Sequence, residues 1–84
     1  MEIRSKFDKG NVVQVFDYIA EKERFLVIKR IESWNYKMGF TYLVRDYNGL
    51  IDERYDELDF SENFEIHGFF KDVKEYERWC NNEK

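Results

Sequence analysis

Three runs rich in β-branched and aromatic residues occupy the first part of the chain, and they constrain its fold more than any other feature. The runs cover residues 12–19, 24–31 and 40–47. Residues of these types fit the pleated surface of a sheet, so each run predicts a strand. The first half of the second run is apolar on both faces, which indicates that this strand is covered on both sides.

A hairpin is predicted directly after the third run, where Asn48-Gly49 stands. This dipeptide favours a type I′ turn because such a turn needs a positive φ at both central positions. Residues 50–55 are therefore expected to return as the fourth strand. Residues 33–39 are expected to form the connection between the second and third strands.

The second half of the chain predicts a turn, a strand and a helix. Residues 56–60 are too few for a helix and too acidic for a central strand, so we predict a 3₁₀ turn. Residues 63–67 alternate between apolar and polar side chains, which predicts a fifth strand. Asp72 followed by Glu75 fits a capping box at the start of a helix over about 72–82. The apolar face of that helix is expected to contain Phe69, Val73, Tyr76 and Cys80, with Trp79 beside it.

The length and the aromatic content predict one folded domain over residues 1–84. Eight Phe, six Tyr and two Trp stand among the 84 residues. Because a short chain buries a small share of its surface, these large rings must supply most of its core. The charged fraction of 38 % does not indicate disorder, since disordered segments lack aromatic and β-branched residues.

Three short segments carry a resemblance to a known family. Residues 9–13 (KGNVV) form a glycine-polar-valine entry, residues 42–49 (YLVRDYNG) a central hairpin, and residues 56–58 (DEL) an acidic segment before the last strand. In this order they resemble small SH3-like β-barrel proteins of phages and Gram-positive bacteria. The resemblance implies a mostly β fold, a five-stranded SH3-like barrel over about residues 7–67, with a 3₁₀ turn before the last strand and a C-terminal α-helix. The ligand strand, tandem Trp and ligand-face proline of eukaryotic signalling SH3 domains are missing, so polyproline binding is not implied.

Side chains suited to catalysis or metal binding are few. His67 and Cys80 are the single histidine and the single cysteine, and they lie on different predicted elements. A nucleophile and its base must lie within hydrogen-bond reach. Zinc needs four nitrogen or sulfur ligands, and the carboxylates at 52–59 lack the spacing of an EF-hand. We therefore expect no enzymatic activity, no cofactor and no metal site.

The sequence predicts a cytoplasmic protein that does not enter a membrane. One cysteine cannot form a disulfide within the chain. No apolar run approaches the roughly 18–20 residues that a membrane span requires. The charged N-terminal segment has no apolar stretch behind it, so it does not resemble a signal peptide.

Acidic residues are concentrated in one third of the chain. Residues 46–65 carry a net charge of −7, residues 1–45 carry +3, and residues 66–84 are neutral. The acidic third either keeps the domain soluble or binds a protein with a basic surface. Mimicry of nucleic-acid phosphate is the alternative, and it would make the chain an inhibitor of a DNA- or RNA-handling protein. The acidic candidates for partner binding are Asp52, Glu53, Asp56, Glu57 and Asp59.

The connection at 33–39 supplies the aromatic candidates, Trp34, Tyr36 and Met38. Trp and Tyr are frequent anchors of interfaces, so this loop either binds a partner or forms a homodimer contact, or else Trp34 packs back onto the outside of the barrel or against the terminal helix. Rings interleaved with cations also suit single-stranded nucleic acid, although the pI of about 5.0 argues against that. The cations concerned are Lys29, Arg30, Lys37 and Arg45. We therefore predict a small non-catalytic protein-interaction module that uses an acidic face and an aromatic loop.

Overall fold

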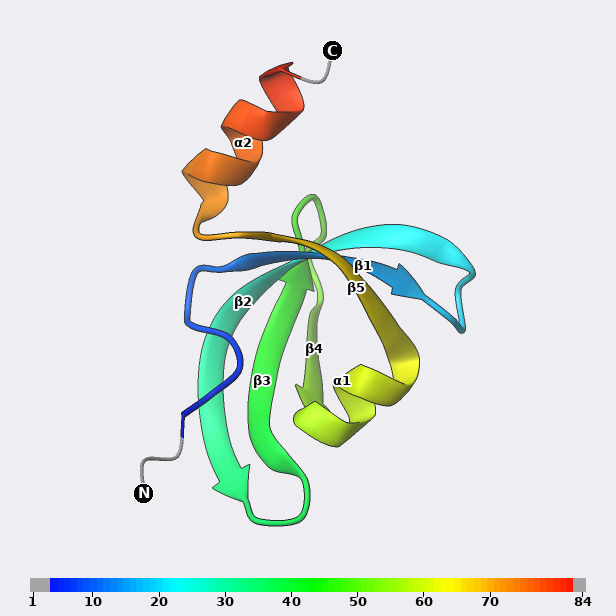
Figure 1. Ribbon diagram of the computed structural model, residues 1–84, viewed down its shortest axis with the longest axis vertical. Coiled ribbons are helices and arrows are strands. Elements are labelled where there is room, and N and C mark those ends of the chain that lie inside the picture. Colours follow the sequence, from blue (N-terminus) through cyan, green and yellow to red (C-terminus); the bar gives the residue numbers. More distant parts are fainter. Residues whose placement is uncertain (1–3, 83–84) are drawn as a thin grey trace.

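A computed structural model describes residues 4–82 and shows a mostly β fold with two helices (Figure 1). Five antiparallel strands form one sheet in the order β4-β3-β2-β1-β5. The elements are β1 (Val12–Asp17), β2 (Lys22–Asn35), β3 (Gly39–Asp46), β4 (Asp52–Asp56), α1 (Glu57–Asn63), β5 (Phe64–Phe70) and α2 (Val73–Asn82). All five predicted strands are therefore present, as is the predicted C-terminal helix.

Strand β2 is much longer than predicted, with 14 residues, and it curves strongly (Figure 1). Its first part pairs with β1 and its second part with β3. The register of the β2–β3 pair shifts between Ile28 and Arg30 and again between Ile31 and Ser33. Such bulges bend a strand and increase its twist, which lets one strand serve both parts of the sheet. The predicted connection at 33–39 is accordingly reduced to a turn at residues 36–38.

The β3–β4 hairpin is confirmed, but its predicted turn is wrong. The Gly49 N–H donates to the Asp46 carbonyl at 2.9 Å, so Tyr47 and Asn48 are the central residues. Neither has a positive φ, and β4 begins only at Asp52. A hydrogen bond to β2 explains why the turn lies one residue earlier than predicted. The Tyr47 N–H donates to the Phe25 carbonyl at 2.9 Å, which holds the chain in place one residue beyond β3.

The predicted 3₁₀ turn is also wrong, because α1 is an α-helix of seven residues. Asp56 caps it: its side chain accepts a hydrogen bond from the Asp59 N–H at 2.8 Å. Acidic side chains in the first turn interact favourably with the positive end of the helix dipole. The helix buries Phe60, and this burial stabilises a helix that extends past the acidic segment, for which only a turn was predicted.

The sheet is not closed, so the predicted barrel is not confirmed. Within residues 4–82, β4 and β5 pair only with β3 and β1 respectively. Helix α1 connects the two edge strands and contacts β3, β4 and β5. Figure 1 shows it at the same end of the molecule as the β2–β3 turn, whereas α2 lies at the opposite end.

The main hydrophobic core joins β1, β2 and β3 to α1, the start of β5 and the segment before β1. Phe7, from the segment before β1, packs its ring against Tyr42 and Phe60, both with ring centroids at 5.2 Å. The buried Tyr42 hydroxyl accepts the Lys6 N–H at 2.8 Å and donates to the Glu57 carboxylate at 2.6 Å. Burial and the Glu57 hydrogen bond raise the pKa of Tyr42. The buried members of this core are Phe7, Val13, Val15, Leu26, Ile28, Tyr42, Val44, Phe60 and Phe64.

A second cluster lies where α2 packs against the sheet. It is built on Val12, Phe70 and Tyr76, with Val73, Trp79 and Cys80 partly buried beside them. The predicted capping by Asp72 is present, since its side chain accepts the Glu75 N–H at 2.8 Å. Phe69 does not belong to this cluster, contrary to prediction. It lies on β5, where neighbouring residues face opposite ways, so Phe70 takes the buried place and Phe69 is exposed.

Candidate functional site

Large apolar side chains are exposed at the end of β2, in the β2–β3 turn and at the adjoining start of α1. The exposed fractions are 48 % for Trp34, 76 % for Tyr36, 41 % for Met38 and 45 % for Leu58. The Leu58 N–H donates to the Met38 carbonyl at 3.3 Å, so the turn and the helix are in direct contact. We call these four side chains the tip patch. Large exposed apolar surface of this kind marks interaction sites in soluble proteins.

Hydrogen bonds hold the turn in one shape. The Asn35 side-chain oxygen accepts the N–H of Lys37 at 2.8 Å and that of Met38 at 3.3 Å. Gly39 then has a φ of +79°, and an added Cβ would lie 2.9 Å from Glu57 Cβ. Only glycine fits this close approach of the turn to α1 without a shift. The exposed rings are therefore carried by a well-defined turn.

A shallow hollow of about 500 Å³ adjoins the tip patch. Met38 and Leu58 provide its apolar surface, and its lining also includes Arg4, Lys6, Lys37 and Glu57. The Glu57 carboxylate is already bonded: it accepts the Tyr42 hydroxyl at 2.6 Å and the Phe40 N–H at 3.2 Å. The hollow thus combines apolar surface with three cations and one carboxylate that serves the fold.

The predicted aromatic residues are therefore brought together, and Leu58 is added to them. Trp34 lies opposite Phe40 in the β2–β3 register, and Phe40 packs against the main core whereas Trp34 is about half exposed. The predicted packing of the loop back onto the sheet would have buried these side chains, but each is exposed. Leu58 was missed because it lies in the segment predicted as a 3₁₀ turn. A helix there places Leu58 beside Met38.

The predicted acidic residues do not share one face. Asp52 and Glu53 are neighbours on β4, where consecutive side chains point to opposite sides. The Arg45 Nε donates to Asp52 at 2.6 Å, which lowers the pKa of Asp52. Glu53 binds Arg24, and Asp56 caps α1. Of the five candidates, Asp59 is exposed and its side chain has no hydrogen bond or ion pair among those found within residues 4–82.

Arg24 is the centre of an ion cluster that the sequence did not predict. Its side chain is only 10 % exposed, and it forms ion pairs with Asp17 at 2.9 Å, with Asp46 at 3.0 Å and with Glu53. Burial lowers the pKa of Arg24, but the three carboxylates raise it by more. Burial likewise raises the pKa of Asp17, whereas the Ala20 N–H and Arg24 lower it to a net value below the usual range. The one sequence signal for this cluster was that Arg24 is a charged residue at an inward position of the second run.

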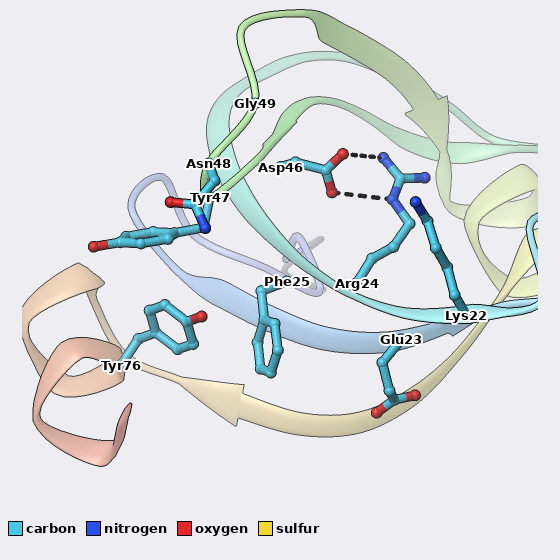
Figure 2. Close-up of a pocket in the computed structure, with 9 residues that line it drawn as sticks. All are labelled: Lys22, Glu23, Arg24, Phe25, Asp46, Tyr47, Asn48, Gly49 and Tyr76. Atoms are coloured by element: carbon cyan, nitrogen blue, oxygen red, sulfur yellow. Dashed lines mark hydrogen bonds and ion pairs between the residues drawn. The ribbon is translucent and has the colours of Figure 1, made fainter. Parts of the chain in front are cut away.

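A pocket of about 330 Å³ lies beside this cluster, between β2, the β3–β4 turn and α2. Figure 2 shows Phe25, Tyr47 and Tyr76 on one side of it and the Arg24–Asp46 pair on the other. The Phe25 and Tyr76 ring centroids are 4.9 Å apart, and those of Tyr47 and Tyr76 are 4.8 Å apart. The rings pack on one another and Arg24 is saturated by carboxylates, so the lining mainly joins α2 to the sheet.

His67 and Cys80 lie in separate surroundings. Cys80 belongs to the α2 cluster. The His67 Nδ1 lies 3.0 Å from a Glu23 oxygen, and its Nε2 lies 3.6 Å from Glu65. The Glu23 hydrogen bond outweighs desolvation and raises the pKa of His67.

A pH titration should report this contact. We expect the His67 pKa to lie above the usual value of about 6.5 and to fall towards it in Glu23→Gln. Because the folded-state pKa is raised, the contact stabilises the fold at low pH and loses its effect as pH rises through that pKa. NMR of the ring protons gives one resonance set, since His67 is the single histidine. An unchanged titration in Glu23→Gln, with the exposed change Glu62→Gln as control, would contradict the assignment.

Comparison with known proteins gives no assignment for this surface. No family model, no curated protein and no solved structure matches the chain. Among residues 4–82, no group of three or more His, Cys, Asp or Glu side chains is placed to hold a metal ion. No helix in the same part of the chain is long and apolar enough to span a membrane.

Proposed function

We propose that the chain is a non-catalytic protein-binding module whose binding surface is the tip patch. The observation that carries this proposal is the exposure of four large apolar side chains at one end of the domain: Trp34 at the end of β2, Tyr36 and Met38 in the hydrogen-bonded turn, and Leu58 on the helix beside it. Aromatic residues and Met are enriched at the centres of protein interfaces. A turn that is already ordered also loses little conformational entropy when it binds.

The acidic segment supports binding less well than the tip patch. A phosphate mimic needs carboxylates that are available to a basic partner, but Asp52, Glu53, Asp56 and Glu57 each accept a bond within the domain. Desolvating a charge that already has a partner gives little net affinity. We therefore do not include these carboxylates in the proposed binding surface.

Single-stranded nucleic acid is a less well supported partner, because some of the cations predicted to bind it form ion pairs within the domain. Lys37 lies over the Tyr36 ring at 5.8 Å and remains part of the tip. Arg30 and Arg45 instead form ion pairs with Glu32 and Asp52. Met38 and Leu58, which neither stack on bases nor bind phosphate, make up half of the tip patch, and they favour a protein partner.

We also propose that the fold is a variant of the SH3-like barrel. The support is the strand pairing, in which β1 pairs with β2 and β5, β2 with β3, and β3 with β4. In this interpretation α1 takes the place of the short turn that precedes the last strand in such barrels. The fold does not by itself indicate the function.

Selection from a phage-displayed library of random 12-residue peptides tests the function. We expect peptides that bind the immobilised protein and lose at least about tenfold in affinity for Trp34→Ala, the loss typical of a hot-spot residue. Leu50→Ala is the matched control, because Leu50 is 90 % exposed but lies outside the tip patch. Isothermal calorimetry gives both affinities. The proposal fails if no selected peptide distinguishes Trp34→Ala from the wild type.

A further inference from the structure

We infer that the tip patch binds the tip patch of a second copy of this chain, in a two-fold arrangement that places the β2–β3 turn of each copy over α1 of the other. The inference rests on the proposed function, because it names the partner of the same surface. A two-fold interface joins one surface to itself, so the surface must be complementary to itself in its apolar part and in its charges.

The apolar part of the patch lies on both of the elements that this arrangement brings together. Tyr36 and Met38 lie in the turn, and Leu58 lies on α1, where its N–H donates to the Met38 carbonyl at 3.3 Å. Met38 and Leu58 also line the same hollow. The turn of one copy can therefore cover Leu58 of the other, and its own Leu58 is covered in return.

The charges beside the patch differ in sign between the turn and the helix. Lys37 stands between Tyr36 and Met38 in the turn. Glu62 is four residues after Leu58, so it lies on the same side of α1, about one helical turn further along. Figure 1 shows α1 leading away from the β2–β3 turn towards β5. Placing the turn over α1 of the second copy therefore brings Lys37 towards Glu62 of that copy, and symmetry forms this pair twice.

The available charges around the patch are balanced in sign. Lys6 and Lys37 are the cations, and Asp59 and Glu62 are the carboxylates; none of these four side chains has an ion pair or a hydrogen bond among those found within residues 4–82. Equal numbers of both signs favour neither a strongly acidic nor a strongly basic partner, but they fit a second copy, in which each sign meets its opposite. Other charged residues near the patch already interact within the domain: Arg4, Arg30, Glu32, Arg54, Asp56 and Glu57.

The size of the patch determines the expected strength of the dimer. Four partly exposed side chains, two of them aromatic, bury less area than a standard interface of about 1,600 Å². Exposed ion pairs add little affinity and mainly fix the orientation. We therefore expect a dissociation constant of about 10–100 μM, weaker than that of standard interfaces.

Sedimentation equilibrium tests for this dimer of the 10.4 kDa chain. Between about 10 μM and about 1 mM the mean mass should rise towards twice that of the monomer. Tyr36→Ala, which removes the most exposed ring of the turn, should raise the dissociation constant at least about tenfold, as for a hot-spot residue. Leu50→Ala is the control, because Leu50 is 90 % exposed but lies outside the tip patch.

Charge reversal tests the two-fold arrangement itself. Lys37→Glu and Glu62→Lys each place like charges opposite one another, so each should raise the dissociation constant by on the order of tenfold at low salt. An equimolar mixture of the two variants restores opposite charges at both pairs and should dimerise nearly as well as the wild type. Lys74→Glu, an exposed change on α2, is the charge-matched control for Lys37→Glu and should change the constant less than about twofold.

The outcomes separate this inference from the proposed function. A chain that stays monomeric at the highest concentration, a dimer that Tyr36→Ala leaves unchanged, or a mixture no tighter than its two components would each overturn the second copy as partner. Peptides that depend on Trp34 would still support the proposed function in each case, because peptide selection does not measure self-association. The altered side chains are exposed, so thermal unfolding should show that each variant is folded.

Discussion

Replacing Arg24 by Met is expected to lower the free energy of unfolding by about 3 kcal/mol at pH 7, close to the cost of removing one partner of a buried ion pair. The substitution leaves Asp17, whose side chain is 9 % exposed, without its cation. It also removes the link that Arg24 makes from β2 to Asp46 and Glu53. For a domain of this size the loss corresponds to a fall of roughly 12–24 °C in melting temperature.

Arg54→Met is the matched control for Arg24→Met. Arg54 pairs with Glu32, but its side chain is 59 % exposed, and exposed pairs contribute about 0–1 kcal/mol. Urea unfolding followed by circular dichroism measures both variants. Equal losses in the two would show that the Arg24 cluster does not stabilise the fold as proposed.

The pH dependence gives a second test of the same cluster. Because the folded-state pKa of Asp17 is lowered, its contribution is present above the unfolded value of about 3.9 and is lost as pH falls through the folded value. In Arg24→Met the buried Asp17 carboxylate has no cation beside it. Protonation of Asp17 at low pH should therefore recover part of the lost free energy of unfolding. The difference in stability between wild type and variant should therefore narrow below about pH 4.

Replacing Tyr76 by Ala is the second large effect, with an expected loss of about 3–5 kcal/mol, as for other large aromatic residues in cores. Tyr76 is 6 % exposed, and its ring packs against Phe25 at 4.9 Å and Phe70 at 5.4 Å between centroids. Helix α2 extends from one end of the sheet, so this ring is a main point of attachment (Figure 1). Urea unfolding gives the loss, and hydrogen exchange should show that the α2 amides lose protection first.

Phe69→Ala provides the control for Tyr76→Ala and also tests the corrected register of β5. The sequence pattern placed Phe69 on the buried face of the helix, whereas the structure leaves it 55 % exposed on the strand. Its removal should cost less than about 1 kcal/mol. A cost equal to that of Tyr76→Ala would mean that Phe69 is buried and that β5 pairs with β1 in a different register.

The tip patch depends on residues that lie outside it. Glu57, at the start of α1, binds the Phe40 N–H and the Tyr42 hydroxyl, and it lies against Gly39 at the base of the turn. Tyr42 in turn is part of the main core. The surface proposed for binding is thus attached to the main core, and a rigid support of this kind holds a binding surface in a defined geometry.

Some of the site was predictable from the sequence. Trp34, Tyr36 and Met38 stand between two β-rich runs, and residues between strands are usually exposed at a turn. Leu58 and the hollow could not be predicted, because both need α1 to lie beside the β2–β3 turn. The sequence also could not predict which carboxylates are bonded within the domain, because a count of charges does not show which of them already have partners. The bonded ones are Asp52, Glu53, Asp56 and Glu57.

Five strands and a C-terminal helix follow from the sequence alone, because β-branched and aromatic runs, an alternating segment and a capping box are local signals. The position of the aromatic side chains at the β2–β3 turn follows in the same way. The exact turns, the extent of α1 and the neutralisation of individual charges emerged only in the folded domain. Each of these depends on contacts between residues that are distant in the chain: Tyr47 with Phe25 sets the β3–β4 turn, and Arg24 with Glu53 removes a carboxylate from the surface.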